Sequence, residues 1–188
     1  MLSYTRRAEM ASRQEPFAIV LGCSDSRVPL EMVFDQGLGD LFVIRVAGNI
    51  VAPSQVGSVE FAASRFGSRL VVVLGHTQCG AISATLEELE GAEPSASRNL
   101  RSIVDRVRPA LEPLVESELA ADREALLHLA VRANVRMAAN QLRHGSALLE
   151  QLAQDGLTVV GAEYDLATGE VEFFDGPVHG SSSAASRP

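Results

Sequence analysis

Residues 17–23 of this chain read FAIVLGC, a continuous apolar run that ends in Gly22 and Cys23. An apolar run of this length without alternation is typical of a strand buried on both faces of a parallel sheet. The runs LFVI at 41–44 and LVVVL at 70–74 repeat the pattern. Because parallel strands need crossover connections between them, the three runs predict an α/β protein.

Helical patterns separate and follow these runs. Apolar residues recur at helical spacing between 58 and 67, and again from Arg123 to Gln154 with Gly145 as a point of interruption. The segment from Leu86 to Leu119 is polar and contains three residues that break helices, so it predicts broken surface helices. These residues are Pro94, Pro109 and Pro113.

The end of the chain predicts two more strands. Residues 157–161 form an apolar run, and the turn at 168–169 before 171–174 indicates a terminal edge pairing. The predicted fold is α/β, with a mainly parallel central sheet of four to five strands flanked by helices. We expect a single domain over 1–180 and a disordered tail over 181–188.

Composition narrows the class of protein. The 188 residues carry a formal net charge of -8, and the arginines form no basic stripe, so nucleic acid is not an expected partner. No apolar run approaches the ~20 residues that cross a bilayer, and a membrane is not expected either. The first residues show no signal-peptide pattern, and two distant cysteines do not suggest a disulfide framework, so a cytoplasmic location is expected.

Candidate metal ligands lie where strands end. Cys23 follows the first strand, His76 follows the third, and Cys79 stands three residues further on. The carboxyl ends of parallel strands meet at one edge of a sheet, where sites of α/β proteins form. Thiolate and imidazole are the ligands that Zn²⁺ prefers, and a catalytic zinc keeps a fourth position open. The sequence therefore predicts a zinc site at the C-terminal ends of the strands.

A simpler interpretation exists for each of these residues. A lone buried cysteine often packs as a small hydrophobic side chain, and the same holds for a single core histidine. Their joint placement favours the metal. Two interpretations are open for Asp25 and Arg27, which lie just after Cys23. They form an ion pair that only fixes the loop, or they take part in the metal site. In the second case Asp25 is a conditional fourth zinc ligand or an acceptor for zinc-bound water, and Arg27 holds it.

Five stretches of the chain resemble the β-class carbonic anhydrases, and the likeness runs from about Gln14 to about Phe174. The two metal-bearing motifs are the most specific, because they occur in the same order. The stretches are CSDSR at 23–27, GDLFV at 39–43, RVAGN at 45–49, GSVEF at 57–61 and HTQCG at 76–80.

The resemblance implies a site and an assembly. It implies zinc on Cys23, His76 and Cys79, an Asp25–Arg27 dyad, and a substrate pocket at the interface of a homodimer or higher even oligomer. The pocket positions that match the family are Gln14, Phe42, Ala47, Phe61 and Gly80.

The implied reaction is the reversible hydration of carbon dioxide to bicarbonate and a proton through a zinc-bound hydroxide. Enzymes that hydrolyse carbonyl sulfide or carbon disulfide are similar and share the ligands, so this activity stays open. A non-catalytic zinc-binding module with Asp25 as permanent fourth ligand is a further alternative. A phosphatase-type nucleophile is disfavoured, because that motif needs five residues between Cys and Arg and here three lie between Cys23 and Arg27.

Overall fold

The protein, described here from a computed structural model, is built on one five-stranded sheet with the order β2-β1-β3-β4-β5. The structure describes residues 4–117 and 122–176, so the tail expected at 181–188 lies outside the described residues. The strands are β1 Ala18–Gly22, β2 Leu41–Arg45, β3 Leu70–His76, β4 Thr158–Tyr164 and β5 Val171–Asp175. The first four are parallel and β5 pairs antiparallel with β4, which confirms the predicted sheet.

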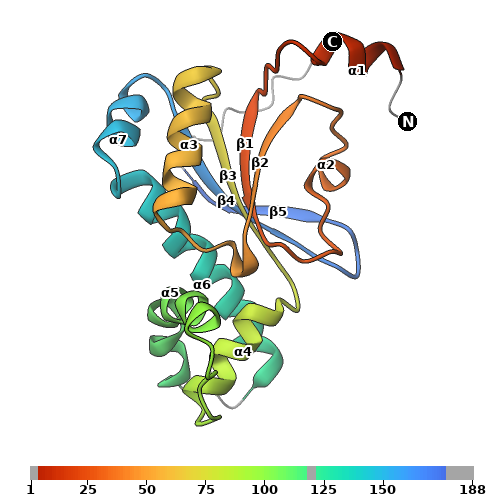
Figure 1. Ribbon diagram of the computed structural model, residues 1–188. Helices are drawn as coiled ribbons and strands as arrows, with labels where there is room; N and C mark the ends of the chain where they lie inside the picture. Colours follow the sequence, from red (N-terminus) through yellow and green to blue (C-terminus); the bar gives the residue numbers. More distant parts are fainter. Residues whose placement is uncertain (1–3, 118–121, 177–188) are drawn as a thin grey trace, which may run out of the picture.

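The helices connect and cover these strands (Figure 1). They are α1 Tyr4–Met10, α2 Leu30–Val33, α3 Pro53–Arg65, α4 Gly80–Leu89, α5 Arg98–Val115, α6 Arg123–His144 and α7 Ala147–Gln154, with a 3₁₀ turn, η1, at Ala47–Asn49. No helix in the described ranges combines the length and the apolar character needed to span a bilayer.

The two faces of the sheet are covered unequally. One face packs under α3, α6 and α7 around buried residues such as Ile19 and Val73. The other face packs around Val20, Val72 and Leu74 beneath α2 and neighbouring loops. A third cluster joins α4, α5 and the start of α6 beyond the carboxyl ends of the strands. This third cluster contains two of the predicted zinc ligands, Cys23 and Cys79.

The prediction of broken helices between 86 and 119 is wrong for α5. This helix runs unbroken through Pro109 and Pro113. Each proline removes one helical hydrogen bond, but both prolines are exposed, so water can bind the carbonyl groups that they leave free. The opposite side of α5 buries Val104, Val107, Ala110 and Leu111, and this packing holds the helix together.

The long helical pattern near the end of the chain divides as predicted. Gly145 caps the C-terminus of α6, and the Ser146 side chain accepts a hydrogen bond from the Leu149 backbone N–H to start α7. The buried face of α6 includes Val131, Asn134 and Val135. The orientation of this face decides which α6 side chains reach the site.

Candidate metal centre

Three predicted ligands come together at the carboxyl edge of the sheet. Cys23 follows β1, His76 ends β3, and Cys79 is the residue before α4. Their ligand atoms all lie within 4.8 Å of one another, and the three residues are 5%, 0% and 1% exposed. Gln78 has a φ of 55°, and the tight turn that results brings Cys79 back toward His76. No other group of three such residues is close enough to share a metal in the described ranges.

The histidine ring is oriented for a metal. His76 Nδ1 lies 2.9 Å from the Thr77 carbonyl oxygen, which can only accept, so Nδ1 carries the proton and donates it. His76 Nε2 is buried and has no hydrogen-bond partner. An unpaired buried nitrogen is costly, and a metal ion would use its lone pair. The imidazole therefore has the tautomer that a metal site needs.

The two thiols are too close to ionise independently. The pKa of Cys23 is lowered, mainly because the Cys79 side chain donates a hydrogen bond to its sulfur, although burial opposes this. The pKa of Cys79 is raised by the same contact with Cys23 and by burial. Two neighbouring buried thiolates need a positive charge between them. A divalent cation supplies that charge, so the donor set of two sulfurs and one nitrogen fits zinc.

Asp25 and Arg27 form a closely bonded pair beside these ligands. The Arg27 guanidinium donates to both Asp25 carboxylate oxygens, at 2.9 and 2.7 Å, and the Arg27 backbone N–H also donates to Oδ1. These bonds hold the pKa of Asp25 well below its usual range. Asp25 Oδ2 lies 3.9 Å from His76 Nε2, so the carboxylate faces the centre while remaining bonded to Arg27.

The structure adds two features of the site that the sequence reasoning did not assign. Arg45, at the end of β2, donates hydrogen bonds to the backbone carbonyl oxygens of Cys23 and Asp25, at 3.0 and 2.6 Å. The backbone N–H of Gly48 donates to Cys23 Sγ at 3.3 Å. Arg45 and Gly48 both belong to the RVAGN stretch at 45–49, and the resemblance of this stretch to the family was the sequence feature that could have indicated their role.

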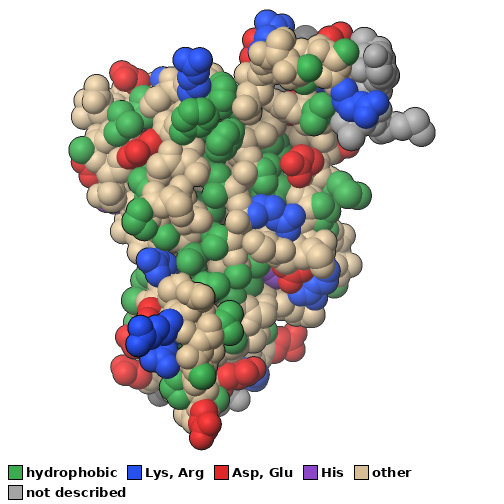
Figure 2. Space-filling view, viewed as in Figure 1, with side chains coloured by type: hydrophobic (Ala, Val, Ile, Leu, Met, Phe, Trp, Pro, Cys, Tyr) green, Lys and Arg blue, Asp and Glu red, His purple; other side chains and the backbone are tan. Residues whose placement is uncertain are grey.

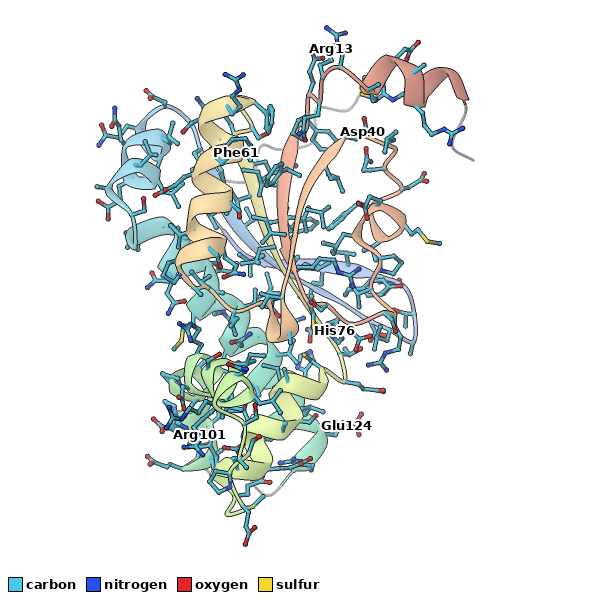
Figure 3. The ribbon with its side chains drawn as sticks, viewed as in Figure 1. Arg13, Asp40, Phe61, His76, Arg101 and Glu124 are labelled. Atoms are coloured by element: carbon cyan, nitrogen blue, oxygen red, sulfur yellow. The ribbon has the colours of Figure 1, made fainter. Side chains whose placement is uncertain are left out.

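The five residues expected to form a substrate pocket divide into two groups. Ala47 and Gly80 are chain neighbours of Gly48 and Cys79 and so lie at the centre. Gln14, Phe42 and Phe61 do not, because Gln14 and Phe42 lie near the amino ends of β1 and β2. Figure 3 shows Phe61 on α3 and His76 at opposite ends of the sheet. One chain alone therefore does not bring the five residues together.

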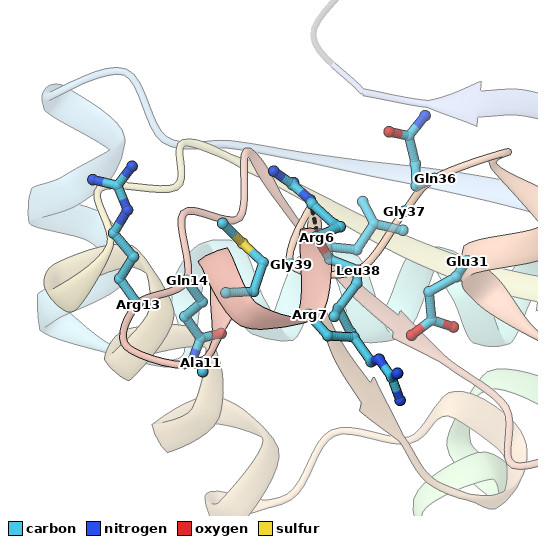
Figure 4. Close-up of a pocket in the computed structure, with 12 residues that line it drawn as sticks. Arg6, Arg7, Ala11, Arg13, Gln14, Glu31, Gln36, Gly37, Leu38 and Gly39 are labelled. Carbon is cyan, nitrogen blue, oxygen red and sulfur yellow. Dashed lines mark hydrogen bonds between the residues drawn. The ribbon is translucent and has the colours of Figure 1, made fainter. Parts of the chain in front are cut away.

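A hollow of about 890 Å³ lies away from the metal ligands. It is found between α1 and the segment before β2, where Gln14 and Arg13 line it (Figure 4). The candidate functional site is placed at the two thiols and the imidazole and not at this hollow. A site that acts on a small substrate needs reactive groups that converge, and a large volume alone does not supply them.

Comparisons with known proteins agree with this geometry. A family model described as carbonic anhydrase matches residues 18–171. A carbonic anhydrase of Mycolicibacterium smegmatis is 42% identical over 168 residues, covering 89% of this chain and 79% of that protein. Carbonic anhydrase 2 of Mycobacterium tuberculosis is 37% identical over 175 residues, covering 92% and 81%.

Solved structures show the same fold. A tetrameric β-carbonic anhydrase from Sordaria macrospora superposes with a TM-score of 0.80 at 24% identity, covering 90% of this chain and 86% of that one. The β-carbonic anhydrase CafA of Aspergillus fumigatus superposes with a TM-score of 0.78 at 30% identity, covering 89% and 79%. The family match spans well over half of the chain. The chain therefore belongs to the β-carbonic anhydrase family, whose zinc-dependent reaction is the hydration of carbon dioxide.

Proposed function

We propose that this protein hydrates carbon dioxide at a zinc ion held by Cys23, His76 and Cys79. The observation that carries the proposal is the convergence of their three buried ligand atoms within 4.8 Å at neighbouring strand ends. When bound, zinc makes water available as hydroxide near neutral pH. The protein supplies the fixed geometry, with the Thr77 carbonyl setting the His76 tautomer.

Asp25 and Arg27 are the proposed catalytic side chains. The Asp25 carboxylate faces the centre and can accept a hydrogen bond from water beside His76 Nε2, which keeps an oxygen lone pair directed at the carbon of the substrate. Arg27 fixes this carboxylate through two side-chain hydrogen bonds. Asp25 is also the proposed conditional fourth metal ligand, because release from Arg27 would free its carboxylate to approach the ligand atoms.

We further propose a homodimer or higher even oligomer whose subunits complete one another's pockets. In that assembly Ala47 and Gly80 of one chain face Gln14, Phe42 and Phe61 of a second copy. The support is that the second group lies far from its own chain's ligands. Phe61 is 54% exposed, and Figure 2 shows hydrophobic side chains gathered between α3 and the β1–β2 side of the sheet. The Sordaria macrospora relative is described as tetrameric.

Two broader proposals accompany this function. We propose that residues 1–180 act as a single domain, because one sheet carries all five described strands and all three core clusters adjoin it. We propose a cytoplasmic location, because two cysteines that serve as metal ligands must stay reduced, and the cytoplasm keeps thiols reduced.

Stopped-flow hydration of carbon dioxide, measured beside the zinc content of the same sample, tests the function. We expect about one zinc per chain, with hydration that falls when zinc is removed and returns when it is restored. Carbonyl sulfide serves as a second substrate. Bound zinc without hydration at any pH would contradict the proposed enzyme, and faster turnover of carbonyl sulfide would reassign its substrate.

A further inference from the structure

One polar side chain interrupts the buried face of α6. Asn134 is 3% exposed and lies between apolar residues on that face. Its side-chain Nδ2 donates a hydrogen bond of 2.8 Å to the backbone carbonyl oxygen of Gly48. A buried amide is kept at such a position only when its hydrogen bonds are satisfied, so this contact fixes how α6 meets η1.

The Gly48 turn is held from a second direction. The backbone N–H of Asn49 donates to the Val46 carbonyl oxygen at 3.0 Å, so the peptide that joins Gly48 to Asn49 is anchored at both its oxygen and its nitrogen. Gly48 has a φ of 68°, a left-handed conformation that favours glycine. With that peptide fixed, the preceding N–H of Gly48 points at Cys23 Sγ, 3.3 Å away.

We propose that Asn134 is a positioning residue of the metal centre, which aims the Gly48 N–H at the sulfur of Cys23. The inference rests on the proposed function in one respect, because it takes Cys23 to be a zinc ligand. Asn134 touches neither metal nor substrate in this arrangement. It acts through the Gly48 turn alone.

A hydrogen bond to a ligand sulfur has two consequences. It stabilises the thiolate form that binds metal, and it withdraws part of the charge that sulfur donates to the metal. Loss of such an outer partner typically lowers metal affinity about 10–100-fold. The hydrogen bond from the Asn49 N–H to the Val46 carbonyl oxygen would still hold part of the Gly48 turn. We therefore expect zinc affinity to fall by about 10-fold, near the lower limit of this range.

Two substitutions remove the donor while keeping the size of the side chain. Asn134→Leu removes both polar atoms, and Asn134→Asp, when its carboxyl group is ionised, presents only acceptors to the Gly48 carbonyl oxygen. Zinc affinity is measured by competition with a chromophoric chelator. The cobalt-substituted proteins report the sulfur directly, because loss of a hydrogen bond to the thiolate should move the sulfur-to-cobalt charge-transfer band to longer wavelength.

Leu142→Ala is the matched control. Leu142 is fully buried on the same helix and belongs to the cluster under α3 and α7 rather than to the one that contains Cys23. We expect this variant to lower the melting temperature while leaving the band position and zinc affinity unchanged. A purely structural role for Asn134 would give the same pattern as this control, and that result would overturn the inference.

The parent protein provides a test that does not depend on folding of the variants. In the protein loaded with ¹¹³Cd, a hydrogen bond from Gly48 N–H to Cys23 should give a scalar coupling between the metal and the Gly48 amide proton. Absence of that coupling in folded, cadmium-loaded protein would overturn the inference. Failure of the parent to bind zinc, cobalt or cadmium at all would instead contradict the proposed metal centre.

Discussion

Replacing Gly75 by alanine should strain the contact between α6 and the sheet beside the metal centre. A Cβ atom at Gly75 would lie 2.6 Å from Val135 Cγ2 and 3.0 Å from Val131 Cγ1. Both valines are buried, and a β-branched side chain in a helix has one favoured rotamer, so neither can turn away easily. Overpacking of this kind costs about 1–3 kcal/mol.

Gly75→Ala also has a smaller effect that raises the free energy of unfolding. Gly75 does not have a positive φ, so alanine fits its backbone and stabilises through the unfolded chain by about 0.4–1 kcal/mol. The free energy of unfolding should therefore fall by about 1–2 kcal/mol. Gly57→Ala is the matched control, because Gly57 lies within α3 and no atom lies within 4 Å of its added Cβ. That variant should gain about 0.5–1 kcal/mol.

A double variant identifies the clash. Val135→Ala removes the methyl groups that meet residue 75, so its combination with Gly75→Ala should be more stable than the sum of the single effects by about 1–2 kcal/mol. The measurement is equilibrium unfolding in urea of zinc-loaded protein at fixed protein and zinc concentrations. Additive effects, or a Gly75→Ala variant as stable as the parent, would refute the reasoning.

Three further predictions concern the site, the assembly and the surface. Cys23→Ser should lose most of its zinc, and metal analysis showing full retention would exclude Cys23 as a ligand. Phe61→Ser should shift the oligomer toward monomer in light scattering with little loss of fold, because the ring is half-exposed in one chain; an unchanged mass would argue against the interface. Hydrogen bonds from the Thr168 and Ala167 backbone N–H groups lower the pKa of Asp165, so its stabilising contribution is present above the ordinary carboxyl pKa and is lost as pH falls. The melting temperature of Asp165→Asn should thus lie below that of the parent near neutral pH, and the gap should close in acid; a constant gap would contradict the cause.

The parts of the fold that the sequence predicted share one physical property. Strands buried on both faces must be apolar throughout, so β1 and β3 were visible as continuous runs. Cys23 and His76 follow such runs directly, and the parallel direction of the strands is enough to bring them to one edge. The predicted ligand set followed from this placement together with Cys79.

The parts of the structure that could not be predicted depend on contacts that leave no periodic pattern in the sequence. α5 keeps its two prolines because of packing on its other side, which local propensity does not reveal. Asn134 and Gly48 stand 86 residues apart, and a bond from a side chain to a backbone carbonyl leaves no mark in composition. The separation of Gln14 and Phe42 from the ligands could have been inferred from the direction of the strands. Gln14 precedes β1 and Phe42 lies near the start of β2, whereas the site lies at the opposite, carboxyl end of the parallel strands.

The packing of α6 and the geometry of the metal centre are coupled through neighbouring residues. The Val135 methyl groups occupy the space left by Gly75 on β3 and by Gly161 on β4, where an added Cβ would lie 2.8 Å from Val135 Cγ1. These glycines let α6 approach the sheet closely. Asn134 precedes Val135 and points about 100° away around the helix, toward Gly48.

A displacement of α6 by Gly75→Ala should therefore weaken the bond from Asn134 to Gly48 as well as the fold. Zinc affinity should fall together with the free energy of unfolding, and Val135→Ala should restore part of both. If stability recovers in the double variant while zinc affinity does not, the added methyl group acts on His76 directly, since His76 follows residue 75 in β3. If both recover, the close approach of α6 to the sheet is what positions the Cys23 sulfur.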